Sequence, residues 1–270
     1  MKVAKIIFKF ITDYFWEMKK IGPFFLFVIL MLHGFSQTSR SVDHILADFK
    51  AGKAEFRHLL KLEMRYPDSA LKNGIEGKVG YKVIIEEDGS FKVGQSLFTL
   101  TDDLNQEAKR LINLCIFSPE SRGSRPVVST KQVIVRFNID QYNNWVDRRV
   151  VQTEYNMTND TTSALYKSKE LDILPWPMYD KKYTSFENYI YTVLQYPVAA
   201  YKKNIFGSTT LEFVVEKSGN LTNMYPIKYL GGGCYEEAKK VLRSVQWKPA
   251  IVDGKPARSI VRQTVHFRLK

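Results

Sequence analysis

The stretches GKVGYKVII (residues 77–85) and GSTTLEFVV (residues 207–215) place bulky side chains, mostly apolar, at every second position. This period of two predicts a β-strand with one buried face. A turn with glycine follows each stretch, at Asp88-Gly89 and at Ser218-Gly219-Asn220, and glycine supplies the positive φ of a tight hairpin. Each stretch is therefore expected to begin a β-hairpin, whose second strand covers residues 91–97 or 221–227.

The two hairpins belong to an internal repeat. Residues 56–139 align with residues 186–269 without a gap, at a shift of 130 positions, and about one position in five is identical. The residues that constrain the backbone coincide: Tyr66-Pro67, Gly77 and Gly89 meet Tyr196-Pro197, Gly207 and Gly219. Shared backbone constraints indicate a shared fold and not only a shared composition.

Helices are predicted on both sides of each hairpin. A first helix starts at Phe56 or Phe186 and ends before the Tyr-Pro pair, because proline disfavours helix in the residue before it. A second helix carries apolar residues at helical spacing over residues 108–115 or 238–245, and a last strand covers residues 131–139 or 261–269. The predicted fold class is α+β: two tandem modules, each a small antiparallel sheet with helices packed on one face.

The remaining segments set the domain boundaries. Lys19-Lys20, an apolar run at residues 21–32 and Gly34-Phe35-Ser36 have the order of a secretory signal peptide. Residues 1–36 are therefore expected to be a signal peptide or, if uncleaved, a short N-terminal anchor in the inner membrane. The first module is expected at residues 56–139, a polar linker at residues 140–185, and the second module at residues 186–270.

The chain is basic, with a formal net charge of +12. For an exported protein this charge favours anionic lipid, peptidoglycan or acidic proteins over nucleic acid as partners. No metal or cofactor is predicted, because Cys115 and Cys234 have no metal or redox spacing. The histidines His44, His58 and His266 also lack metal-like spacing and are expected at the surface.

The chemistry of the remaining residues does not indicate an enzyme. The two thiols are expected either to be buried and free or to form a disulfide between the copies. No serine, cysteine or carboxylate constellation in the sequence has the arrangement of a catalytic site. The sequence therefore predicts a binding or structural protein.

A series of spaced positions in the second copy carries a family resemblance. They are Tyr196-Pro197, Ala200, Ile205, Gly207, Leu211, Phe213, Val215, Gly219, Glu237-Ala238, Trp247, Pro249-Ala250, Gly254-Lys255-Pro256, Val265, Phe267 and Leu269. This pattern resembles the TonB C-terminal domain family, and the export signal suits a Bacteroidetes-type member, here with two tandem copies. The first copy is more divergent, since Phe117 stands in place of Trp247 and Ser124-Arg125-Pro126 in place of Gly254-Lys255-Pro256.

The resemblance implies a periplasmic protein-binding module. Family members capture an extended segment of an outer-membrane receptor by adding it to a sheet edge, during TonB-dependent transport. By resemblance, the partner-binding residues lie on the last strand: Ile260, Val261, Arg262, Gln263, Thr264, Val265, His266, Phe267 and Arg268. The side chains of Arg262, Thr264, His266 and Arg268 are expected to point outward, where they would favour an acidic guest.

Two departures from the family keep alternatives open. The family's transducers have a membrane anchor with a Ser-x-x-x-His pattern, whereas Ile29 stands four positions before His33 here, and a Pro-rich spacer is lacking. A binding protein without a motor is expected as readily as a transducer that contacts an inner-membrane motor complex. The alternative function is a non-catalytic structural protein whose basic surfaces bind peptidoglycan or anionic lipid. Exposed strand edges also permit a homodimer by strand exchange.

Overall fold

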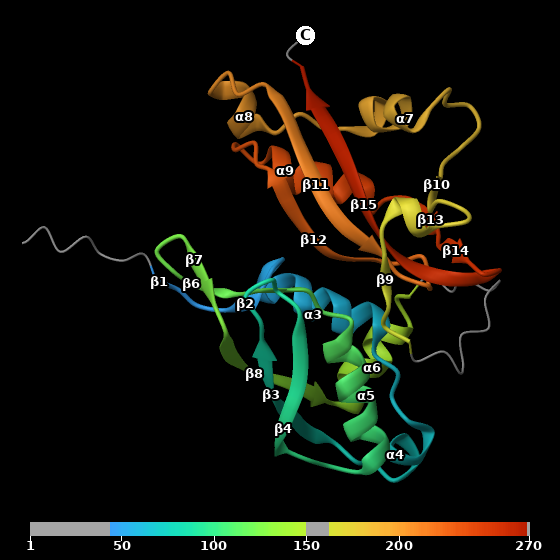
Figure 1. The fold of residues 1–270 in the computed structure, drawn as a ribbon. Helices are drawn as coiled ribbons and strands as arrows, with labels where there is room; N and C mark the ends of the chain where they lie inside the picture. Colours follow the sequence, from blue (N-terminus) through green and yellow to red (C-terminus); the bar gives the residue numbers. More distant parts are fainter. Residues whose placement is uncertain (1–43, 150–161, 269–270) are drawn as a thin grey trace, which may run out of the picture. The chain divides into compact units, whose positions relative to one another are not determined.

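A computed structural model describes residues 44–149 and 162–268 of the chain (Figure 1). The expected signal peptide or anchor at residues 1–36 lies outside the described residues. Residues from His44 onward form one compact unit that contains both copies of the repeat. The predicted α+β fold class is confirmed, because both copies combine helices with a small antiparallel sheet.

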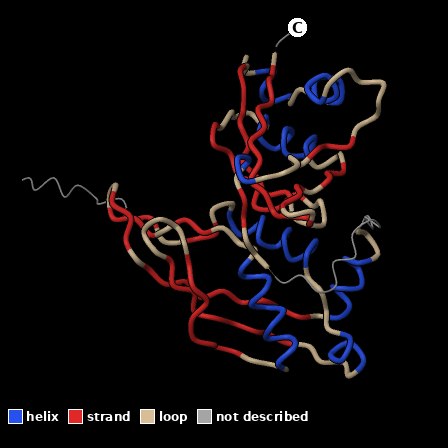
Figure 2. The backbone as a smooth tube through the Cα atoms, turned by 45° about the vertical axis from the view of Figure 1, so that its right-hand side comes forward, coloured by secondary structure: helices blue, strands red, loops and turns tan. Residues whose placement is uncertain are grey.

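The first copy is built around a three-stranded antiparallel sheet in the order β4-β3-β8. Its strands are β3 (Gly77–Ile85), β4 (Phe91–Phe98) and β8 (Ser129–Phe137). Its helices are α3 (Gly52–Glu63), α4 (Asp68–Lys72), α5 (Asp102–Asn113) and α6 (Ile139–Val146). Figure 2 shows these helices gathered on one side of the strands, where they cover the core.

The second copy has the same plan around a sheet in the order β12-β11-β15-β14. Its strands are β11 (Gly207–Val215), β12 (Leu221–Lys228), β13 (Gln246–Lys248), β14 (Ala250–Val252) and β15 (Lys255–Phe267). Its helices are α7 (Phe186–Val193), α8 (Val198–Lys202) and α9 (Cys234–Leu242). Separate apolar cores underlie the two sheets, so each copy packs around its own centre.

The two copies share their strand register residue by residue. Gly77 pairs with Phe137 in the first copy, and Gly207 pairs with Phe267 in the second, which is the same pairing shifted by 130 positions. The first hairpin strand of each copy also departs from regular pairing with its neighbour at two places in the same region. The repeat read from the sequence is therefore a repeat of hydrogen-bonded structure.

The Tyr-Pro pair acts at the same place in both copies. Helix α3 ends at Glu63 and helix α7 at Val193, and the residue that follows each has extended backbone angles. The hydroxyl of Tyr66 donates to the carbonyl of Ile75 at 2.5 Å, and that of Tyr196 to Ile205 at 2.6 Å. Each tyrosine thereby ties the residue before the proline to the loop that leads into the first hairpin strand, across the short helix between them.

Some boundaries differ from those expected. Helix α3 begins at Gly52, four residues before Phe56, whereas α7 begins at Phe186 as expected, because the Ser185 side chain accepts a hydrogen bond from the Asn188 N–H. Strand β8 ends at Phe137, because the side chain of Asn138 caps α6. In the second copy the last strand is longer than expected and begins at Lys255.

Short strands that precede each copy pair with it. In the first copy, β1 (His44–Ile45) pairs with β6 (Glu120–Arg122), and β2 (Asp48–Phe49) pairs with β5 (Phe117–Ser118). A further strand, β7 (Arg125–Val127), completes the hairpin with β6.

The second copy has equivalent pairings. Ile173 bridges to Ile251 of β14, and β10 (Trp176–Met178) pairs with β13. Strand β9 (Leu165–Tyr166) lies parallel to the start of β15, and a 3₁₀ turn (Ser168–Glu170) follows it. Ile173, β9, β10 and the 3₁₀ turn fall inside the segment expected as a linker. Strands of two or three residues, one of which contains Pro177, leave no period in the sequence.

Candidate partner-binding edge

Strand β15 is the longest strand of the structure, with 13 residues from Lys255 to Phe267. One of its sides pairs with β11 from Ser259 to Phe267. Its other side pairs with β14 through residues 255–257 and with β9 through Arg258 and Ser259. Beyond Ser259 that side meets no other strand of the described chain, so residues 260–267 form an open sheet edge.

The predicted partner-binding residues lie on this edge. Eight of them, from Ile260 to Phe267, are in β15, and Arg268 follows directly after the strand. Val265 and Phe267 are buried in the core under the helices. Arg262, Thr264 and His266 alternate with them and therefore lie on the opposite face of the sheet, called here the open face.

Arg262 is already paired on the open face. Its Nε donates to Glu212 Oε2 at 2.6 Å, although 69% of its side chain is exposed. Burial alone would raise the pKa of the Glu212 carboxyl, but hydrogen bonds from Tyr225 and Arg262 outweigh burial and lower it. A guest strand would therefore meet an Arg262 side chain that is already paired with Glu212. The sequence did not reveal this pair, because Glu212 is far from Arg262 along the chain.

A second ion pair on the open face is buried. Arg258 Nε donates to Glu216 Oε2 at 2.6 Å, and the two side chains are 3% and 2% exposed. The guanidinium also donates to the Leu114 carbonyl of the first copy at 2.8 Å. Because a desolvated ion pair needs such further hydrogen bonds, the first copy completes the site that holds Arg258.

The first copy covers this half of the open face through further polar contacts. The Asn223 side chain donates to the Leu114 carbonyl at 2.9 Å and accepts from the Ile116 N–H at 3.1 Å. Ser218 and Asn220 donate to the Glu63 carboxylate at 2.6 and 2.8 Å. Burial and the nearby Glu216 raise the pKa of Glu63.

Glu55 of helix α3 anchors the same contact. Its carboxylate accepts from Lys239 Nζ at 2.5 Å and from Arg243 Nη2 at 2.7 Å, both on or next to α9. His58, one turn later on α3, is partly buried beside them, so only part of its side chain lies at the expected surface. Burial and the charge of Arg243 lower the pKa of His58 to about 4.

The two long edges of the second sheet differ in accessibility. At the β12 edge, the Met224 N–H donates to Glu55 of the first copy at 3.3 Å, and Pro226 has no N–H to offer. Helix α3 lies against this strand. Helix α7 also contacts β15, but the side of β15 between Ile260 and Phe267 contains no proline and pairs with no strand of the described chain, so a guest strand could form hydrogen bonds there.

Other kinds of site are not indicated by the described residues. No group of three or more His, Cys, Asp or Glu side chains gathers there in a way that could hold a metal ion. Cys115 and Cys234 are both free and buried, which decides between the two expectations for the thiols. Burial raises the pKa of both. Within residues 44–149 and 162–268, no helix has the length and apolar character needed to cross a membrane.

The fold defines a class: two tandem α+β modules, the second of which has an unpaired strand edge among the described residues. The family described as the Gram-negative bacterial TonB protein C-terminal matches residues 63–139 and 192–269, more than half of the chain, and the chain belongs to this family. The predicted resemblance, with two copies in tandem, is confirmed. No curated protein and no solved structure matches the chain. The family consists of non-catalytic protein-interaction domains of envelope transport.

Proposed function

We propose that this chain captures an extended segment of an outer-membrane receptor, or of another envelope protein, by strand addition along residues 260–267. The capture takes place in the periplasm and serves TonB-dependent transport. The observation that carries the proposal is the open side of β15, which continues beyond the short stretch occupied by β9 and β14.

The energetics of such an edge suit a reversible partner. About half of the N–H and C=O groups of an edge strand point away from its sheet, ready for a guest. Each hydrogen bond that replaces one to water contributes a net of about 0.5–1.5 kcal/mol. A guest of about eight residues therefore gains several kcal/mol from the backbone, while its side chains set the choice of partner.

Peptide binding tests the proposal. Fluorescently labelled peptides from the periplasm-facing N-termini of outer-membrane receptors are titrated with the protein. Each peptide is compared with two N-methylated forms, one modified at its odd-numbered residues and one at its even-numbered residues. N-methylation removes backbone donors and keeps the side chains. Strand addition predicts that a bound peptide loses at least tenfold in affinity on one N-methylation register and little on the other, since about three hydrogen bonds are lost.

The same titration separates the alternative function. Strand addition depends little on ionic strength, whereas binding by surface charge weakens steeply with salt. Absence of binding by every peptide, together with salt-sensitive retention on peptidoglycan or anionic vesicles, would support the structural alternative. A homodimer through the same edge would compete with the peptides, and it is recognised because the apparent affinity then falls as the protein concentration rises.

A further inference from the structure

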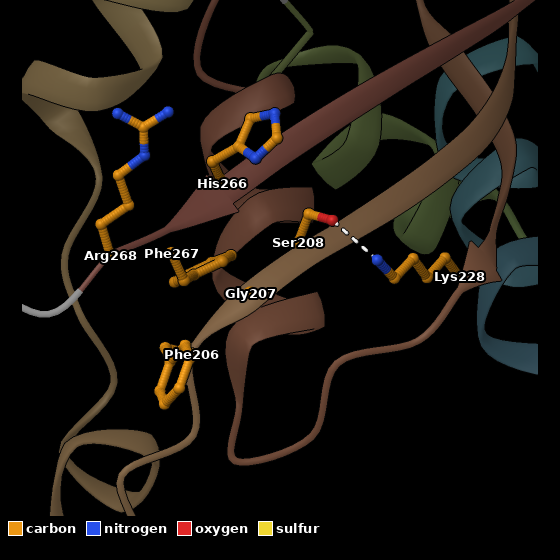
Figure 3. Close-up of a pocket in the computed structure, with 7 residues that line it drawn as sticks. All are labelled: Phe206, Gly207, Ser208, Lys228, His266, Phe267 and Arg268. Atoms are coloured by element: carbon orange, nitrogen blue, oxygen red, sulfur yellow. Dashed lines mark hydrogen bonds between the residues drawn. The ribbon is translucent and has the colours of Figure 1, made fainter.

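An open cavity of about 530 Å³ lies where the open edge ends. Its walls include Phe206, Ser208, Lys228, His266 and Arg268 (Figure 3). These residues come from the loop before β11, from β11 itself, from the end of β12 and from the end of β15. The cavity is therefore on the open face of the sheet, next to the last residues that a guest on β15 would pair with.

The cavity wall carries two cationic side chains, Lys228 and Arg268, and the imidazole of His266. No carboxylate lines it, and in the described chain none of Lys228, His266 and Arg268 forms an ion pair. Lys228 Nζ donates to Ser208 Oγ at 3.0 Å, which holds the ammonium group above β11. The other two cations of this face, Arg258 and Arg262, are already paired with Glu216 and Glu212.

We infer that the cavity receives a carboxylate side chain, Glu or Asp, of the guest strand, so that the guest must be acidic at the end beside His266. This inference rests on the proposed function. Neighbouring strands are about 4.8 Å apart, so a guest residue beside His266 can place its carboxylate over β15. There the guest carboxylate would contact the side chains of His266 and Arg268. It would also approach the Lys228 ammonium group, which reaches across β11 from β12.

The first copy has different residues at the positions that line this cavity. At the positions equivalent to Phe206, Lys228 and Arg268 it has Glu76, Phe98 and Asn138. The Glu76 carboxylate accepts from the Asn138 side chain at 3.0 Å and from the backbone N–H of Ile139, so it serves the start of helix α6. A negative charge stands where the second copy has an apolar ring. The first copy also carries cations here, because Lys78 and Arg136 stand at the positions of Ser208 and His266, so the two sites differ by the added carboxylate and by the loss of Lys228.

Lys228 gives a clean test because it is two strands away from the edge. The substitution Lys228→Gln removes one charge from the cavity and leaves every backbone group of β15 in place. Lys248→Gln is the matched control: it removes the same charge from exposed β13 of the same copy. Each receptor peptide that binds is made with an amidated C-terminus and with its acidic residues changed one at a time to Gln or Asn.

The expected result is a coupled loss. Neutralising one terminal acidic residue of the peptide weakens binding about fivefold, as for a partly exposed charge-assisted contact. Lys228→Gln weakens the unchanged peptide by a similar factor, has little effect on the neutralised peptide, and exceeds the effect of Lys248→Gln.

Two outcomes would overturn the inference while leaving strand addition intact. One is equal affinity of acidic and neutralised peptides for the unsubstituted protein. The other is a Lys228→Gln protein that keeps its peptide affinity but loses retention on phosphatidylglycerol vesicles, which would assign the cavity to a lipid head group. Failure of every peptide to bind would contradict the proposed function itself, so the two failures are distinct.

Discussion

The two copies have the same strand register and both bury the face under their helices, but the second copy also buries part of its open face. In the first copy, the side chains of Lys78, Lys82 and Ile84 on the open face of β3 are exposed. At the equivalent region of β11, Glu212, Val214 and Glu216 are buried, although two of them are acidic. Two sheets with the same backbone therefore differ in what is covered. The first copy packs against part of the open face of the second sheet, whereas the open face of the first sheet is exposed.

The residues at equivalent positions explain this difference. In the second copy, Arg258 is paired with Glu216. The equivalent residues of the first copy are Val128, which is more than half exposed, and Glu86. The second copy thus buries polar groups, Arg258 and Asn223, that hydrogen-bond to the first copy. The first copy supplies those partners, and the side of β15 beyond Ser259 pairs with no described strand.

Breaking the buried ion pair is expected to have the largest effect. Arg258→Leu leaves the Glu216 carboxylate buried without its partner, which costs about 3–5 kcal/mol of unfolding free energy. Arg262→Leu, on the same strand, removes an exposed partner and is expected to cost less than about 1 kcal/mol. Urea unfolding of both variants measures the difference, and equal losses would contradict the role given to burial.

Removing the anchor on helix α3 is expected to have the next largest effect. Glu55→Gln weakens charge-assisted contacts to Lys239 and Arg243 and is expected to cost about 1.5–3 kcal/mol. Hydrogen exchange should quicken along β12 and α3, where the copies meet. The exposed Glu187→Gln on α7 serves as control, and a similar pattern in both variants would argue against a contact between the copies at Glu55.

The contact between the copies is also expected to depend on pH. The folded protein holds His58 neutral, with a pKa of about 4, whereas the unfolded chain binds a proton below about pH 6.5. Stability is therefore lost as the pH falls from about 6.5 toward 4, by about 1–2 kcal/mol after allowance for the partial exposure of the ring.

Comparison with His58→Gln isolates this dependence. The raised pKa of Glu63 acts in the opposite direction, because it favours proton uptake in the folded state, but it is present in both proteins. Urea unfolding at pH 7 and at pH 4.5 should show a larger loss in the unsubstituted protein. The same loss in both proteins would mean that His58 is not held neutral.

The smallest expected effect concerns the tryptophan that distinguishes the copies. Trp247 Nε1 donates to the Leu242 carbonyl at 3.2 Å, and its ring packs edge-on against Phe186 and Phe213. Trp247→Phe introduces the residue of the first copy, Phe117, and should cost about 1 kcal/mol for the lost hydrogen bond. Thermal unfolding measures it, and peptide affinity should be unchanged. A loss of affinity would instead indicate that Trp247 contacts the guest.

The sequence allowed the repeat, the hairpins and the last strand to be predicted, because periodicity and the Gly and Pro positions carry that information. It did not predict the short strands at residues 44–49 and 173–178, whose pairing depends on distant partners. The pairs of Glu212 with Arg262 and of Glu216 with Arg258 were also missed. Cross-strand partners 42 or 50 positions apart are visible only once the register is known.

The most direct test of strand addition at the second copy is an NMR titration of the isotope-labelled chain with receptor peptides. The account predicts amide shift changes along residues 260–267 of β15 and at neighbouring residues of β11, with none along Ser129–Phe137 of β8. Shift changes centred on β8, or peptide binding that leaves the amides of residues 260–267 unmoved, would contradict it.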